Sequence, residues 1–183
     1  MKRKIRIIST AVFLCLVLAI MSVGIYAASS IAIIGNGNLY FKATDVLASV
    51  SVVGTNSKSF VADQSFEIEY GDDGSQRTVT FGEYTFTDTN DSISFDISVT
   101  NNFDETSNIK IMSTLTASVT DEDNFKVEIT KGAEGIDSAA GTEVSAGAAN
   151  SVTYTVTITY TGAVDIENSA TFNFNLSLER IAS

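Results

Sequence analysis

The most regular pattern in the chain is the alternation of apolar and hydroxyl side chains along Ser151–Tyr160, whose sequence is SVTYTVTITY. Successive side chains of a strand point to opposite faces, so the large residues of this segment share one face and the hydroxyls share the other. Thr, Val, Ile and Tyr also suit a pleated, half-buried surface. Because an apolar face needs a second layer against it, the segment predicts a strand of a β-sandwich.

The same period of two recurs along most of the chain and is interrupted by turn residues such as Gly71-Asp-Asp-Gly74. We expect further strands at 39–53, 66–70, 78–87, 92–100, 108–120, 125–129 and 171–181. No segment after residue 27 has a helical period. The pattern therefore predicts an all-β fold, a jelly-roll-like or Ig-like antiparallel β-sandwich of about eight to nine strands.

Two segments depart from the simple alternation. Within Thr78–Thr87 the large side chains change parity at Gly82-Glu83, which predicts a β-bulge. Residues 131–150 are rich in Gly, Ala and Ser, and their only large apolar residues are Ile136 and Val144. We expect that segment to be a mobile loop or a long crossover.

The first 27 residues have the three-part layout of a secretory signal peptide, which precedes the sandwich as a signal helix. A basic stretch from Lys2 to Arg6 comes before an apolar run over 7–20, and small residues lead to an expected cleavage after Ala27. The alternative is a retained membrane anchor, because the apolar run is nearly long enough to span a bilayer. Cleavage would leave residues 28–183 as a single secreted β-sandwich domain without a membrane span.

The charge of that domain restricts its partners. Residues 28–183 hold seven basic and 22 acidic residues, a net charge of −15. Such a surface repels nucleic acid and anionic lipid, so neither is an expected partner. The only Cys of the chain lies in the leader, so we expect no disulfide in the domain.

The types of side chain present also restrict the chemistry. The chain has no His and no Trp, and its single Cys is Cys15. The domain therefore lacks histidine-based triads, cysteine nucleophiles and the common zinc ligand sets. A carboxylate pair could serve a glycoside hydrolase, but the acidic residues cluster in turns or on polar strand faces. We expect no catalytic residue, no cofactor-binding residue and no enzymatic activity.

Two acidic turns are candidate calcium sites, because carboxylate oxygens suit a hard cation. The first contains Asp72 and Asp73, and the second contains Asp121 and Asp123. Neither turn has the ligand spacing of an EF-hand loop. The alternative, which we favour, is that both are solvated turns.

Gly24-Ile-Tyr-Ala-Ala28 closes the leader, a short apolar strand follows, and Ser94–Asn102 is an apolar strand that ends in Thr-Asn-Asn. In this plan the chain resembles the TasA/camelysin family of secreted proteins of Gram-positive bacteria. The resemblance implies a jelly-roll-like sandwich that polymerises into extracellular matrix fibres, and export through a dedicated signal peptidase. Two features depart from it. Ala-Ser-Ser follows the cut in place of Tyr-Phe-Ser-Asp, and a chain without His does not support the metalloprotease activity ascribed to camelysins.

The resemblance also implies that the mature N-terminus can be donated as a strand to the next subunit. Within 28–38 the matching strand is Ser30–Ile34, with Gly35–Asn38 as its hinge. The implied self-assembly residues are Ile31, Ile33 and Ile34. Burial of each Ile contributes about 1.5–3 kcal/mol, and backbone pairing sets the register. The alternative, which we favour, is pairing within the same subunit, because it has no association cost.

These expectations combine into a secreted, non-enzymatic structural protein of the cell surface or biofilm matrix. Its partners would be copies of itself or other surface proteins, bound through strand edges. One rival is a monomeric adhesin or carbohydrate- or protein-binding module that uses loops 71–75, 101–108 and 131–150. Another is a hydrolase with a carboxylate pair. Fibre formation separates the first two, because a matrix subunit polymerises and a binding module stays monomeric.

Overall fold

The computed structural model describes residues 31–41, 46–56, 59–69, 77–132, 134–135, 141–162 and 169–181. Over these residues the chain contains eleven strands and no helix. The all-β class predicted from the alternation is therefore confirmed. The expected leader, residues 1–27, lies outside the described residues.

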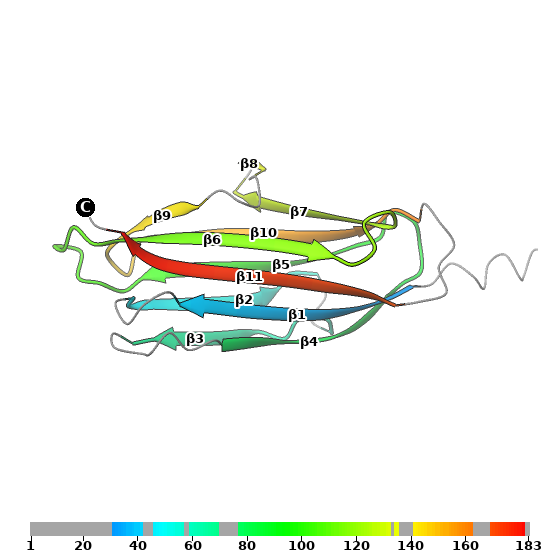
Figure 1. Cartoon of the computed structure of the whole chain (residues 1–183), viewed down its shortest axis with the longest axis horizontal. Coiled ribbons are helices and arrows are strands. Elements are labelled where there is room, and N and C mark those ends of the chain that lie inside the picture. The colour runs from blue at the N-terminus through cyan, green and yellow to red at the C-terminus, as the bar shows by residue number, and fades with distance from the viewer. Residues whose placement is uncertain are drawn as a thin grey trace, which may run out of the picture.

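The strands follow the chain in order and are labelled in Figure 1. Their bounds are β1 Ile31–Phe41, β2 Ala48–Gly54, β3 Gln64–Ile68, β4 Arg77–Phe86, β5 Ser92–Asn101, β6 Lys110–Val119, β7 Phe125–Lys131, β8 Glu134–Gly135, β9 Thr142–Ser145, β10 Ser151–Tyr160 and β11 Ala170–Ile181. The number exceeds the expected eight to nine, and two of the strands, β8 and β9, lie in segment 131–150, which we expected to be a loop or crossover. In β9 a single buried apolar residue, Val144, suffices to anchor the strand.

The strands form two sheets that face each other (Figure 1). One sheet has five strands in the order β4-β1-β11-β6-β9, and the other has six in the order β3-β2-β5-β10-β7-β8. Side chains from both sheets meet in one core. For example, the Tyr154 hydroxyl of β10 donates a hydrogen bond to the Ser113 carbonyl of β6 (3.0 Å). The fold is therefore a two-layer β-sandwich.

β10 occupies the segment that the alternation predicted, Ser151–Tyr160, and pairs with β5 and β7 on its two sides. Its apolar residues are buried, as expected. Its hydroxyl face carries hydrogen bonds between neighbouring strands. Thr155 donates to the Asp96 carboxylate (2.6 Å), and the hydroxyl oxygens of Ser98 and Thr153 lie 2.8 Å apart. The outer face of this strand is thus ordered by side-chain pairs across the sheet.

The bulge predicted in β4 is present. β1 advances two positions, from Ile34 to Asn36, while its partner β4 passes three, from Glu83 to Thr80. The extra residue of β4 changes which of its side chains face the core. The parity slip at Gly82 in the sequence therefore reports a real irregularity of the sheet, and the prediction is confirmed.

The core beside the bulge is aromatic. It contains five rings, and the neighbouring rings have centroids 5.1 to 6.5 Å apart in tilted or edge-to-face arrangements. The rings belong to Phe60, Phe81, Phe95, Phe172 and Phe174. Aromatic pairs in such arrangements contribute about 0.5–1.5 kcal/mol beyond the burial of their area. The rings come from both sheets and from the segment before β3, so this cluster joins the two layers.

The segment expected as a hinge, Gly35–Asn38, lies within β1, which is one continuous strand over Ile31–Phe41. Two of the three predicted self-assembly residues are buried in the core: Ile31 is 3 % and Ile33 is 0 % exposed. Ile34 lies on the outer face and is 44 % exposed. The glycines that suggested flexibility instead face aromatic rings, so they provide space for close packing.

We expect Gly82→Ala to lower the free energy of unfolding by about 1–3 kcal/mol. The Gly82 N–H donates to the Phe60 carbonyl (2.7 Å), and an added Cβ would collide with the Ser59 carbonyl oxygen. Because that oxygen belongs to the backbone, the whole segment must shift. Urea unfolding followed by circular dichroism measures the change, with Thr85→Ala at an exposed position of β4 as control. Equal stability of the two variants would contradict the packing argument.

Candidate functional site

The first candidate site is the place of β1, the strand that contains the predicted self-assembly residues. β1 lies inside the five-stranded sheet, between β4 and β11 (Figure 1). It pairs antiparallel with β4 over Ile31–Leu39 and parallel with β11 over Ile33–Phe41. We call the gap between β4 and β11 the β1 slot. Both walls of this slot come from parts of the chain far from β1 in sequence.

The pairing of β1 with β11 is the one parallel pairing among the described strands, of which they are the first and the last. Parallel neighbours cannot be joined by a hairpin, so tertiary contacts alone hold β1 against β11. β4 has no other neighbour in the five-stranded sheet. The sheet therefore needs a strand in the β1 slot to keep β4 and β11 in one layer.

Two glycines of β1 face the core in this slot. A Cβ on Gly35 would lie 2.5 Å from the Phe81 ring, and a Cβ on Gly37 would collide with Phe174 and lie 2.8 Å from Phe81. The ring of Phe81 therefore lies across β1, over both glycines. The absence of two side chains makes room for one ring, a pairing known to support glycine in sheets.

The outer edge of β4 is partly closed by the side chain of Gln64, the first residue of β3. The Thr80 N–H donates to the side-chain oxygen of Gln64 (3.0 Å), and the Gln64 amide nitrogen donates to the Thr80 carbonyl (2.9 Å). These are the two bonds that a residue of a neighbouring strand would make. The other described outer strands, β3, β9 and β8, have five, four and two residues. Short or capped edges leave little room for strand addition.

The second acidic turn is ordered by its own hydrogen bonds. Both carboxylate oxygens of Asp121 accept from the side-chain amide of buried Asn124 (3.1 and 3.2 Å). The carbonyl of Asp123 accepts from the Thr161 hydroxyl (3.3 Å). In the part of the chain that the structure describes, no three His, Cys, Asp or Glu side chains gather as a metal-binding group. Asp72 and Asp73 lie outside that part, and calcium at either turn stays a prediction.

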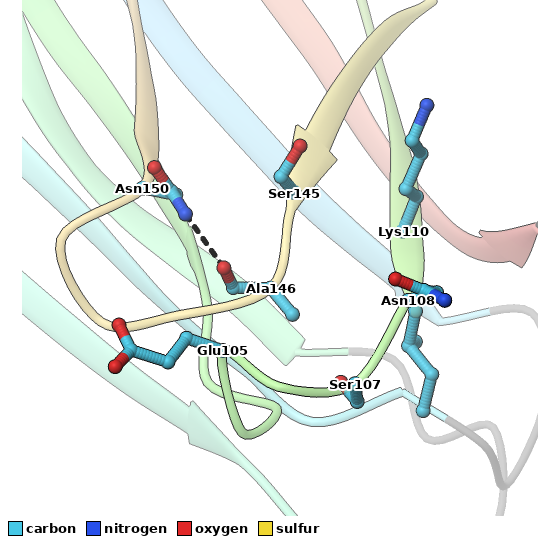
Figure 2. A pocket seen from close by; sticks show the side chains of 8 residues that line it. Glu105, Ser107, Asn108, Lys110, Ser145, Ala146 and Asn150 are labelled. Carbon is cyan, nitrogen blue, oxygen red and sulfur yellow. Dashed lines mark hydrogen bonds between the residues drawn. The ribbon is translucent and has the colours of Figure 1, made fainter.

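The second candidate site is a pocket of about 400 Å³ at one end of the sandwich (Figure 2). It lies between segment 105–110, which leads into β6, and segment 145–150, which follows β9. Its lining is Glu105, Ser107, Asn108, Ile109, Lys110, Ser145, Ala146 and Asn150. The structure thus brings together parts of two predicted binding loops, 101–108 and 131–150. The third predicted loop, 71–75, lies outside the described residues.

Asn101, at the end of β5, holds the two pocket segments in place. Its fully buried side-chain amide donates to the carbonyls of Ile109 (3.2 Å) and Val144 (2.9 Å). Its side-chain oxygen accepts from the Phe103 N–H (3.2 Å), and its backbone carbonyl accepts from the Gly147 N–H (3.1 Å). One residue of the six-stranded sheet therefore holds the start of β6 and the end of β9 in the other sheet.

Each pocket segment also has a turn with its own hydrogen bonds. The Asp104 carboxylate accepts from the backbone N–H of Thr106 (2.8 Å) and from its hydroxyl (2.6 Å). These bonds hold the pKa of Asp104 below its ordinary value. The Asn150 amide donates to the Ala146 carbonyl (2.6 Å; dashed in Figure 2). Both walls of the pocket are therefore preorganised.

The lining of the pocket is suited to binding a polar molecule. Amides, hydroxyls and the Glu105 carboxylate offer hydrogen-bond donors and acceptors, and Ile109 adds an apolar surface. Lys110 is engaged by an exposed ion pair with Glu143 (2.7 Å). The lining contains no His or Cys to act as base or nucleophile. Its chemistry fits recognition by hydrogen bonds.

Sequence reasoning missed the roles of Phe81, Phe174 and Asn101. A signal for the first two was available, because Gly35 and Gly37 stand two residues apart inside a strand pattern, where glycine marks close approach. No such signal distinguishes Asn101 from Asn102 beside it. Their roles depend on which carbonyls lie nearby in the folded chain.

Comparisons with known proteins assign no family to the chain. Neither a scan against protein-family models nor a search of curated proteins finds a match. Within the described residues, no helix has the length and apolarity needed to cross a bilayer. Function must therefore be inferred from the residues and the fold.

We expect Asn101→Ala to lower the free energy of unfolding by about 1–3 kcal/mol, because it leaves buried backbone groups without their partner. The carbonyls of Ile109 and Val144 lose a donor, and the Phe103 N–H loses an acceptor. Urea unfolding measures the loss. Asn108→Ala, at an exposed position of the pocket, is the control and should change stability by less than about 0.5 kcal/mol.

Thr106→Val should raise the pKa of Asp104 toward its ordinary value, because it removes the hydroxyl donor and keeps the backbone donor. A folded-state pKa below the unfolded value stabilises the fold above the unfolded pKa, and that stabilisation is lost as pH falls through the folded pKa. Carboxyl-carbon NMR titration of both proteins measures the shift. An Asp104 pKa equal in the two proteins would show that the hydroxyl bond is absent in solution.

Proposed function

We propose that the chain is a secreted, non-enzymatic structural protein of a Gram-positive cell surface or matrix, which associates with copies of itself by exchange of β1. In the assembled form, β1 of one subunit would fill the β1 slot of the next. The N-terminal residues 1–27 would direct export and be removed. The proposal includes the jelly-roll-like topology that the TasA/camelysin resemblance implies.

The observation that supports this proposal is the position of β1. It is the first described strand, yet it lies inside a sheet, between β4 and β11. A terminal strand can be replaced by the same strand of a second copy without rearranging the others. Because the contacts in the slot would be identical, exchange changes only which subunit supplies the strand.

The burial and backbone pairing of β1 in the slot provide enough free energy to connect two subunits. β1 buries Ile31, Ile33 and Leu39 in the core. Each such side chain contributes about 1.5–3 kcal/mol on full burial, and the backbone of the strand pairs on both sides. Within one subunit the slot is filled at a high effective concentration, so the closed monomer competes with the assembly. Assembly is therefore favoured by high protein concentration and by conditions that loosen β1.

The charge of the domain acts against association. With −15 charges on 156 residues, neighbouring subunits repel one another at low salt. Salt screens that repulsion over about 8–10 Å at physiological ionic strength. The exchanged strand itself carries no charged residue over Ile31–Phe41, so the connection is neutral where it is made.

The alternative function is that of a monomeric binding module, and the pocket of Figure 2 favours it. Its amides, hydroxyls and carboxylate suit the vicinal hydroxyls of a saccharide, and the ordered walls reduce the entropy lost on binding. A chain that stays monomeric in every condition but binds a cell-wall polysaccharide would support this alternative.

The assembly proposal is tested with a cysteine pair in residues 28–183, which contain no natural Cys. Ala32 and Thr85 are register partners across β1 and β4. Such partners have Cα atoms about 4.5–5.5 Å apart, within the range for a disulfide. We expect Ala32→Cys/Thr85→Cys oxidised as a monomer to be closed and unable to assemble, and reduction to restore fibres in negative-stain electron microscopy.

The same variant shows whether β1 is donated by the same subunit or by a neighbouring one. Fibres assembled under reducing conditions and then oxidised should give covalent ladders on a non-reducing gel, because the two thiols lie in different subunits. Ala32→Cys alone, the control, should give nothing larger than a dimer. Fibres that form from the oxidised monomer, or that give no ladder, would show that strand exchange does not connect the subunits.

A further inference from the structure

The ring of Phe81 packs closely against two glycines of β1, Gly35 and Gly37. An added Cβ on Gly35 would lie 2.5 to 2.7 Å from the Cβ and ring of Phe81. An added Cβ on Gly37 would lie 2.8 Å from the same ring and would collide with that of Phe174. Such separations are well below van der Waals contact, so even a methyl group at either position displaces a ring.

The ring of Phe81 cannot move aside at low cost. Its centroid lies 5.1 Å from Phe60, 5.6 Å from Phe95, 6.0 Å from Phe172 and 5.7 Å from Phe174. These neighbours belong to both layers of the core, where side chains are close-packed. A larger residue in the slot would therefore disturb the aromatic cluster as a whole.

This fit decides the register of β1, which the apolar pattern alone leaves open. A slip by one residue turns exposed Ile34 and Asn36 into the core and is excluded by the alternation. A slip by two keeps the alternation, because core-facing residues stay core-facing. It would, however, place Ile33 or Leu39 where a glycine now lies beneath Phe81. The glycine spacing is thus what excludes the second kind of slip.

We propose that the β1 slot accepts only a strand with two small residues at alternate core-facing positions, as Gly35 and Gly37 are in β1. Larger side chains at these positions would collide with the rings of Phe81 and Phe174. The partner that fits is the β1 strand of a second copy of this chain, in one register. Between subunits, this specificity rests on the proposed function, because there the strand comes from another copy. Within one subunit the same fit sets how β1 folds into place.

The specificity in trans is tested with synthetic peptides of the β1 sequence, IAIIGNGNLYF, carrying a C-terminal lysine tag for solubility. Each peptide is added in excess while residues 28–183 assemble, and fibre mass is measured. We expect the natural peptide to inhibit assembly and the peptide with Gly37→Ala to require roughly tenfold more for the same inhibition. The peptide with Asn36→Ala, changed at an outward position of the strand, is the matched control and should inhibit like the natural one.

The specificity in cis is tested in the protein itself, whether or not it assembles. Gly37→Ala should reduce the folding equilibrium constant by about 5- to 150-fold in urea unfolding, and Asn36→Ala should leave it nearly unchanged. Combining Gly35→Ala with Phe81→Ala should cost less than the two single changes together, because the ring that collides is gone.

The outcomes separate the two proposals. Loss of stability in Gly37→Ala, together with coupling between positions 35 and 81, supports the requirement for glycine at positions 35 and 37, which we call the glycine rule. It does so even if no fibres form and the proposed function fails. Fibres that respond to the natural peptide and to the Gly37→Ala peptide alike overturn the rule while the proposed function stands. Additive effects of Gly35→Ala and Phe81→Ala overturn it in the monomer as well.

Discussion

The packing of β1 between β4 and β11 is the constraint on which the five-stranded sheet depends. β4 has no other partner in that sheet, and the rings of Phe81 and Phe174 cover the glycines of β1. The same rings contact Phe95 of the opposite sheet, so the position of β1 affects both layers. A strand of eleven residues thus joins the sheet, the aromatic cluster and the bulge of β4 into one unit.

That dependence is also what makes strand exchange physically reasonable. After the proposed removal of residues 1–27, β1 would be a terminal segment, and the slot could then be filled from within or from a neighbour by the same contacts. Competing routes are restricted in the described structure, because the outer strands are short and the Gln64 side chain occupies the middle of the β4 edge. Among the described strands, the β1 slot is therefore the place that best fits the self-association we propose.

The end of the sandwich that carries the polar pocket is organised by other contacts. There the buried amide of Asn101 bonds the carbonyls before β6 and within β9, and the turns at Asp104 and Asn150 order the two walls of a polar pocket. None of these residues belongs to β1, β4 or β11. Assembly and ligand binding would thus use different parts of the molecule, and one does not require the other.

The sequence by itself determined the all-β class, the position of most of the long strands, where β4 bulges and which residue types are absent. Each of these follows from local properties: alternation along one strand, a slip of parity at Gly82, and the residue types present. The tertiary structure decided that Gly35 and Gly37 pack rather than bend, that β1 lies parallel to β11, and that Val144 anchors a strand in a segment of small residues. It also decided which of two adjacent asparagines holds the pocket. The physical reason is that partner choice depends on contacts between residues far apart in the chain, and a periodic pattern describes only one strand at a time.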